Sequence, residues 1–217
     1  MDFSLARQFM IDSQIRPSGA TDPELVAAFA NTPREAFVPT AMRPVAYSEI
    51  SIETAEDRAL WRPRDLALLI EAAEPAATDV ALIVGAGAGY ETALLSHLVE
   101  TAIGLEEGEA DSTATSERLA EHGFDSALCV PGKLEAGLAD QAPFDLILIA
   151  GMVETLPSSW TDQLSEGGRL AVVVSDGSGY GHARIYTKAG GTVAFRNVFE
   201  VSVPKFPAFD KATNFAF

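Results

Sequence analysis

The amino-acid sequence predicts an α/β protein with a mostly parallel sheet, a C-terminal antiparallel hairpin and a helical N-terminal extension. Three observations lead to this prediction. Short runs that are apolar along their whole length alternate with helical segments between residues 80 and 174, which is typical of a parallel sheet covered on both faces. Two more strand-like runs flank a Gly-Gly turn near residue 190. Before residue 75 the signals are helical instead.

The N-terminal part predicts three helices. Apolar residues at helical spacing predict the first from about Phe3 to Ile15. A second helix is expected to begin at Thr21, placed as N-cap, with Glu24 three residues later as the other half of a capping box. The same arrangement at Thr32 predicts a short third helix that ends near Phe37.

A long segment without clear periodicity follows, from Pro39 to Leu60, and predicts a loop. Long loops in compact domains are often functional. An amphipathic helix is expected to begin at Pro63, because proline is favourable in a first helical turn. No internal repeat or linker interrupts the chain, so we expect one domain.

The remainder of the chain predicts a seven-stranded sheet. Five apolar runs alternate with helices and are expected to lie parallel, and two more form the hairpin around residues 188–191. Strands are expected at residues 80–84, 102–105, 127–130, 145–149, 170–174, 183–187 and 193–198, and helices after residue 90, at about 112–122 before Gly123, and at about 158–164.

Three alternating glycines lie between the first of these strands and the next helix, in the segment from Gly85 to Gly89. Glycine lets the backbone approach a ligand closely, and a helix N-terminus offers free N–H donors. The last glycine or alanine of a dinucleotide fingerprint is absent, because Tyr90 or Thr92 occupies its place. The loop matches the Gly-x-Gly-x-Gly turn of S-adenosylmethionine enzymes, and Glu106, ending the next strand, is placed to accept hydrogen bonds from ribose hydroxyls. A tight turn without a ligand is the alternative.

Composition argues against several classes of partner. The 31 acidic and 15 basic residues give a formal net charge of −16, which disfavours nucleic acid and anionic membranes, because phosphate binding depends on Lys and Arg. The apolar runs are too short to span a bilayer. Cys129 is the single cysteine and the three histidines lack ligand spacing, so we expect neither a disulfide nor a metal site. We expect a cytoplasmic protein.

Six pieces of the sequence occur in the order in which one enzyme family carries them. They are Pro33-Arg34-Glu35-Ala36-Phe37-Val38-Pro39, Ala46-Tyr47, Gly85-Ala86-Gly87-Ala88-Gly89-Tyr90-Glu91-Thr92, Ile103-Gly104-Leu105-Glu106, Ala142-Pro143-Phe144-Asp145 and Gly167-Gly168-Arg169-Leu170. On these pieces the chain resembles the protein-L-isoaspartate O-methyltransferase family. The first block is the most specific, whereas the last two are common to many methyltransferases.

The resemblance implies a Rossmann-like class I methyltransferase fold, with a single methyltransferase domain over residues 1–217. Residues 1–75 would form the helical extension and substrate-side loop, and residues 76–217 the cofactor-binding core. The implied reaction is methyl transfer from S-adenosyl-L-methionine to the free carboxylate of an L-isoaspartyl residue in a protein or peptide. The implied cofactor-binding residues are Gly85, Ala86, Gly87, Gly89, Tyr90, Glu106, Gly132 and Lys133. The sequence does not specify an oligomeric state.

Several polar positions depart from the family pattern. Ile83 stands where the family has an acid, and Lys133 stands where it has aspartate after Gly132. The family's Gln-Thr-Ile-Ser stretch aligns with Arg58-Ala59-Leu60-Trp61. An ionised carboxylate needs no general base to be methylated, so the missing serine removes an orienting hydrogen bond and not a nucleophile.

The catalytic residues are therefore unassigned, with Ser51, Thr54 and Trp61 as candidates. The two hydroxyls could replace the missing serine, and Trp61 is either a lid over the cofactor or a core aromatic. The segment from Ala46 to Leu60 is expected to act as a gate on the acceptor side of the site. Its entrance should be negatively charged, because the segment has four acidic residues and a single basic one, Arg58. The alternative function is a non-catalytic or substrate-switched relative that keeps the fold as a binding module.

Overall fold

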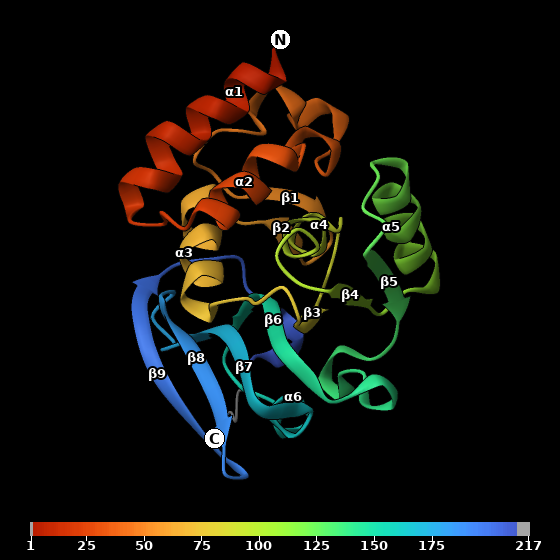
Figure 1. The fold of residues 1–217 in the computed structure, drawn as a ribbon, viewed down its shortest axis with the longest axis vertical. Coiled ribbons are helices and arrows are strands. Elements are labelled where there is room, and N and C mark those ends of the chain that lie inside the picture. Colours follow the sequence, from red (N-terminus) through yellow and green to blue (C-terminus); the bar gives the residue numbers. More distant parts are fainter. Residues whose placement is uncertain (1, 212–217) are drawn as a thin grey trace, which may run out of the picture.

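A computed structural model describes residues 2–211, and its main sheet has seven strands in the order β5-β4-β3-β6-β7-β8-β9 (Figure 1). The strands from β5 to β7 are parallel, and β8 is antiparallel to both of its neighbours. This arrangement confirms the predicted α/β fold with its C-terminal hairpin. The predicted cofactor-binding core runs to residue 217, and its residues 212–217 lie outside the described part.

The seven strands expected from the apolar runs are all present. They are β3 (Val80–Val84), β4 (Thr101–Glu106), β5 (Ala127–Pro131), β6 (Phe144–Val153), β7 (Leu164–Ser175), β8 (Gly181–Ala189) and β9 (Thr192–Val201). The helices are α1 (Phe3–Met10), α2 (Pro23–Asn31), α3 (Pro63–Ala73), α4 (Tyr90–Leu95), α5 (Glu109–Glu121) and α6 (Ser158–Asp162). In the described part of the chain, no helix has the length and apolar character needed to cross a membrane.

The start of α2 corrects the predicted N-cap. The cap is Asp22 and not Thr21, and its carboxylate accepts hydrogen bonds from the N–H groups of Glu24 and Leu25, each at 2.9 Å. The reason is that Pro23 occupies the first helical position, so the residue just before it must be the cap.

Two other helix predictions need correction. The first helix is α-helical only to Met10 and continues as a π-helix over Ile11–Ile15. The predicted helix at Thr32 is a single 3-10 turn, Arg34–Ala36, without a side-chain cap. The hydroxyl of Thr32 donates back to the carbonyl oxygen of Ala28 at 2.8 Å, so it is not free to cap the next turn.

The segment expected to be a loop contains regular structure. A 3-10 helix spans Thr40–Val45, and an antiparallel hairpin is formed by β1 (Ile52–Ala55) and β2 (Arg58–Leu60). The two strands bury one residue each, Ile52 and Leu60, which is too few to produce a visible alternation in the sequence. The hairpin is a finding of the structure.

Arg34 joins the extension to the rest of the molecule. Its side chain is fully buried, and it donates to the carbonyl oxygens of Ala46 at 2.7 Å and Trp61 at 2.6 Å. Its guanidinium also lies 4.9 Å from the ring centroid of Tyr90. Pieces of the sequence that carry the family resemblance therefore meet at one side chain. Helix α2 contacts both α3 and α4, and the π-helix Ile11–Ile15 also contacts α3; α1 and α2 lie above α3 and α4 in Figure 1.

The strand order directs attention to one edge of the sheet. From central β3 the chain continues to β4 and β5 on one side and to β6 and β7 on the other. Open parallel sheets bind ligands outside the carboxyl ends of their strands at such a reversal. The loop from Gly85 to Gly89 leaves β3 at this edge, Glu106 ends β4 there, and Ala150 and Gly151 belong to the last part of β6.

Candidate functional site

The glycine loop adopts a backbone conformation that its glycines make possible. Gly85, Gly87 and Gly89 have φ angles of +76°, +51° and +93°, in the left-handed region that other residues rarely adopt. The carbonyl oxygen of Leu105 accepts hydrogen bonds from two loop N–H groups at 3.0 and 3.1 Å. The loop is thus fixed against β4 before any ligand binds.

Two side chains of α5 hold the loop from the other side. Thr115 donates its hydroxyl to the carbonyl oxygen of Gly87 at 2.7 Å, and Arg118 donates to that of Ala88 at 2.9 Å. The path of the loop therefore depends on α5 as well as on the strands. Such hydrogen bonds keep a binding loop in one shape and reduce the entropy lost on binding.

Glu106 is buried at the end of β4, and its carboxylate is saturated with donors. The N–H groups of Gly87 and Glu107 donate to Oε2 and Oε1 at 2.9 and 3.0 Å. Arg58, on β2, donates Nε to Oε2 at 2.8 Å and Nη2 to Oε1 at 2.5 Å. Burial opposes ionisation of Glu106, but the hydrogen bonds and charge of Arg58 outweigh it and hold the pKa of this carboxyl below its usual range.

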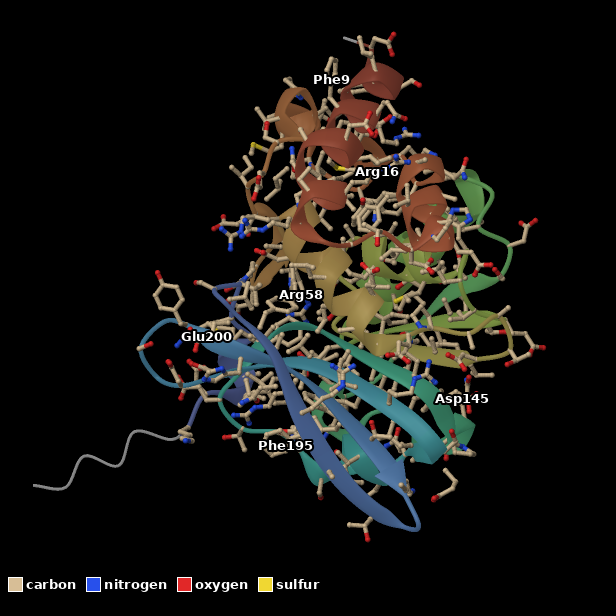
Figure 2. The ribbon with its side chains drawn as sticks, turned by 60° about the vertical axis from the view of Figure 1, so that its left-hand side comes forward. Phe9, Arg16, Arg58, Asp145, Phe195 and Glu200 are labelled. Carbon is tan, nitrogen blue, oxygen red and sulfur yellow. The ribbon has the colours of Figure 1, made fainter. Side chains whose placement is uncertain are left out.

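Arg58, on β2, lies between the N-terminal helices and the main sheet, as Figure 2 shows. Its guanidinium carbon is 5.0 Å from the ring centroid of Phe206, which follows β9. Its side chain is 14% exposed. The residue therefore connects the hairpin with the end of β4 and with the C-terminal segment.

Phe206 fills the space between the ends of β3 and β6. Its segment runs beside β6, where the N–H of Met152 donates to Pro204 and the N–H of Phe206 donates to Met152, both at 2.8 Å. A Cβ atom on Gly85 or on Gly151 would overlap the Phe206 ring. The absence of a side chain at Gly85 and Gly151 therefore leaves the space that the Phe206 ring occupies.

Two cavities border this arrangement. The larger, of about 450 Å³, lies between the hairpin and α5, and Gly87, Glu106 and Asp111 are on its wall. The smaller, of about 10 Å³, lies over Gly85 and is bounded by Arg58 among other residues. Space is available beside Glu106, whereas the region over Gly85 is closed by Arg58 and Phe206.

The structure places the three catalytic candidates in different surroundings. Thr54 lines both cavities, and its hydroxyl donates to the carbonyl oxygen of Arg58 at 3.3 Å. Ser51 is exposed. Trp61 is fully buried and donates its indole N–H to the carbonyl oxygen of Ala150 at 3.1 Å. Of its two interpretations, a lid or a core aromatic, the geometry is that of a core aromatic.

The predicted cofactor residues are only partly brought together. Gly85, Ala86, Gly87 and Glu106 line the two cavities, and the backbone of Gly89 accepts from α4. The side chain of Tyr90 is absent from both walls because its ring packs 5.6 Å from that of Phe37. Two further residues are also absent from these walls, Gly132, whose N–H donates to the backbone of Glu106 at 2.9 Å, and the exposed Lys133.

Glu91 is a site residue that the sequence analysis did not single out. It is 2% exposed, borders the small cavity, and has Oε1 without a hydrogen-bond partner among the described residues. Burial raises the pKa of this carboxyl to about 7. No local sequence pattern marks a glutamate in a helix as buried, and none links Arg58 to Glu106, 48 positions away.

Solved structures share this fold. A protein-L-isoaspartate O-methyltransferase superposes with a TM-score of 0.79 at 22% identity, over 92% of this chain and 65% of that one. A Plasmodium falciparum structure named for the same enzyme, in complex with S-adenosyl-L-homocysteine, superposes with a TM-score of 0.77 at 16% identity, over 94% and 98% of the two chains. At these identities the likeness establishes the fold.

The residues at the site fit an S-adenosyl ligand in their chemistry. The glycine loop permits close approach, and the larger cavity has the volume of a small-molecule site. The carboxylate of Glu106 can accept from ligand hydroxyls only in place of a donor that it now holds. The region over Gly85 is available only after Arg58 and Phe206 turn away. The chemistry of the loop and of the larger cavity thus suits the cofactor, while Arg58 and Phe206 occupy the space over Gly85.

Sequence comparisons show the family directly. The family profile described as Protein-L-isoaspartate(D-aspartate) O-methyltransferase matches residues 6–205. Relatives named protein-L-isoaspartate O-methyltransferase are 38% identical in Roseiflexus castenholzii, over 80% of this chain and 79% of the relative, and 38% identical in Koribacter versatilis, over 79% and 78%. As its motifs predict, this chain belongs to the protein-L-isoaspartate O-methyltransferase family.

Proposed function

We propose that this protein is an S-adenosylmethionine-dependent O-methyltransferase that methylates the free carboxylate of an L-isoaspartyl residue in a protein or peptide. The observation that carries the proposal is the contact between Glu106 and the glycine loop, at the carboxyl ends of β3 and β4. Both lie in the part of the chain that matches the family, residues 6–205. The names of its relatives supply the substrate class.

The loop from Gly85 to Gly89 and the carboxylate of Glu106 would hold the cofactor, with Glu106 accepting from its ribose hydroxyls. When bound, S-adenosylmethionine supplies a methyl group attached to a positively charged sulfur, which is the electrophile of the reaction. Tyr90 follows the loop, and its buried ring packs against Phe37, so it would not contact the cofactor from either cavity wall. Gly132 and Lys133 would contribute at most to the outer rim of the site, because they lie away from the described cavity walls.

The protein has to orient the acceptor and exclude water, and it does not need to remove a proton. The carboxylate of an isoaspartyl residue is already ionised at neutral pH. Orientation of two reactants is worth up to about 7–11 kcal/mol when their geometry is ideal. The hairpin β1–β2 borders both cavities, and its Thr54 would have to release its hydrogen bond to the carbonyl oxygen of Arg58 to orient the acceptor. Trp61 keeps the wall in place through Ala150.

Calorimetry and a matched pair of peptides test this function. The protein is titrated with S-adenosylhomocysteine, and transfer of labelled methyl groups is then compared between an isoaspartyl peptide and the same peptide with ordinary aspartate. We expect binding, and labelling confined to the isoaspartyl form. Equal labelling of both peptides would contradict the proposed acceptor. Absence of binding at millimolar ligand would favour the non-catalytic alternative.

A further inference from the structure

The carboxylate of Glu106 has no acceptor position left for a ligand. Oε1 accepts from Arg58 and Glu107, and Oε2 accepts from Arg58 and Gly87. A carboxylate offers about four lone-pair positions. Ribose hydroxyls would therefore have to replace existing donors. The two backbone N–H groups are fixed by the fold, so the donor that can leave is the side chain of Arg58.

Arg58 needs a new anionic partner when it leaves. The side chains of Arg58 and Glu106 are 14% and 6% exposed, and Phe206 covers the guanidinium from one face. A charge in such surroundings is strongly disfavoured without a counter-ion. The other acids that act on Arg58 are Asp57 and Glu107. Both are exposed to water, and pairing with exposed acids is weak.

The methyl acceptor carries a suitable anion. The planar fork of arginine matches the two oxygens of a carboxylate, as its present pairing with Glu106 shows. The hairpin otherwise presents acids, Glu53, Glu56 and Asp57, on a chain with a net charge of −16. An anionic acceptor would be repelled there without a cation. Arg58 is the cationic side chain on the wall of the cavity over Gly85.

We propose that Arg58 exchanges one carboxylate partner for another, pairing with Glu106 in the free protein and with the carboxylate of the acceptor in the ternary complex. This inference rests on the proposed function. Arg58 is then the residue that selects anionic acceptors. While Glu106 holds the guanidinium of Arg58, the guanidinium is not available to the acceptor. Binding of the cofactor to Glu106 releases Arg58 and thereby promotes binding of the acceptor.

The test measures this coupling by calorimetry. S-adenosylhomocysteine and an isoaspartyl peptide are titrated separately and together into wild type, Arg58→Gln and the control Arg16→Gln. Arg16 is an exposed arginine in the N-terminal extension, apart from Arg58 in Figure 2. In wild type we expect each ligand to raise the affinity of the other about tenfold, because coupling between two sites is reciprocal.

In Arg58→Gln we expect S-adenosylhomocysteine alone to bind roughly fivefold tighter than in wild type, because no ion pair has to be broken, and the coupling to fall below about twofold. Arg16→Gln should behave as wild type. Equal ligand affinity in wild type and Arg58→Gln, or coupling that persists in the variant, overturns the exchange and leaves the proposed function intact. Absence of S-adenosylhomocysteine binding to both proteins overturns the proposed function and the exchange together.

Arg58→Lys is measured in parallel, with thermal unfolding as the check that each variant is folded. Lysine keeps the charge but lacks the two-pronged geometry that arginine shows toward Glu106. In Arg58→Lys we expect the coupling between the two ligands to be about threefold, intermediate between the values for wild type and Arg58→Gln. If Arg58→Gln does not fold, this variant decides the matter, because coupling equal to that of wild type would contradict the role of the guanidinium.

Discussion

The glycine loop and the hairpin β1–β2 face the same cavities, but they are specified by different kinds of interaction. The loop follows from local backbone geometry, because glycines at three positions adopt φ angles that disfavour other residues. The hairpin and the residue after it depend on partners far along the chain, since Arg58 pairs with Glu106 and Trp61 with Ala150. The shape of the loop, on the proposed cofactor side, thus begins with local glycine conformations that contacts from β4 and α5 then hold in place. The hairpin, on the proposed acceptor side, depends on long-range side-chain pairs.

Trp61→Ser gives the sharpest test of that difference. It restores the serine of the family pattern, but it removes a fully buried indole and its hydrogen bond to Ala150. We expect a loss of about 3–5 kcal/mol in the free energy of unfolding, measured in urea, and no gain in methylation. Trp61→Phe, which keeps most of the volume, is the control. Unchanged stability with higher activity would show that Trp61 lines the acceptor site.

Glu91→Gln tests the buried carboxyl behind the loop through pH. Burial raises the pKa of Glu91 from 4.5 to about 7, so between these values the folded protein binds a proton that the unfolded chain has released. The free energy of unfolding must then fall as pH rises through this window. The variant should exceed wild type by roughly 3 kcal/mol at pH 8 and match it at pH 4.5.

Urea unfolding at pH 4.5 and at pH 8 checks this expectation, with Glu117→Gln as the control. Glu117 is an exposed glutamate on α5, so its replacement should shift stability little at any pH. Parallel stability curves for wild type and Glu91→Gln would mean that the carboxyl of Glu91 ionises normally in the folded protein.

Gly87→Val tests the loop itself. Valine is strained at a φ of +51°, and it would turn the N–H that donates to Glu106. We expect the affinity for S-adenosylhomocysteine to fall about a hundredfold, a change of about 2.7 kcal/mol. Gly123→Val is the matched control, because Gly123 has a φ of +77° and a Cβ there would meet no atom within 4 Å. Unchanged affinity in a folded Gly87→Val protein would remove the loop from the binding site.

The parts of the fold that the sequence predicts depend on short-range patterns. The seven strands and Glu106 at the end of β4 follow from apolar runs and their boundaries. The N-cap of α2 could also have been predicted from the sequence, because Pro23 at the first helical position implies that Asp22 is the residue just before the helix. The hairpin was not, since its short strands bury only Ile52 and Leu60.

The unpredicted parts of the site are contacts between distant residues. Arg58 and Glu106 are 48 positions apart, and no periodicity links them. Phe206 lies after the last strand and reaches Gly85 only because its segment pairs with the end of β6. Local patterns identify the loop and the acid as candidates. They do not show that the protein's own side chains occupy the space between them.

Neutralising two acids of the acceptor side should give the smallest effect. Glu53 is exposed on β1, and Glu49 pairs with the half-exposed Arg64 at 3.3 Å. The double variant Glu49→Gln, Glu53→Gln therefore removes two negative charges and leaves Arg64 paired with Asp65 alone. At low salt we expect the ratio of methylation rates, acidic over basic isoaspartyl peptides, to rise about two- to threefold. Near 1 M salt the Debye length is about 3 Å, so the ratio should return to the wild-type value. The control neutralises Glu100 and Glu121. Both lie toward the amino ends of the parallel strands, away from the site: Glu100 directly precedes β4 and Glu121 ends α5. If the ratio of acidic to basic peptides equals that of wild type at both salt concentrations, the hairpin region does not select acceptors by charge.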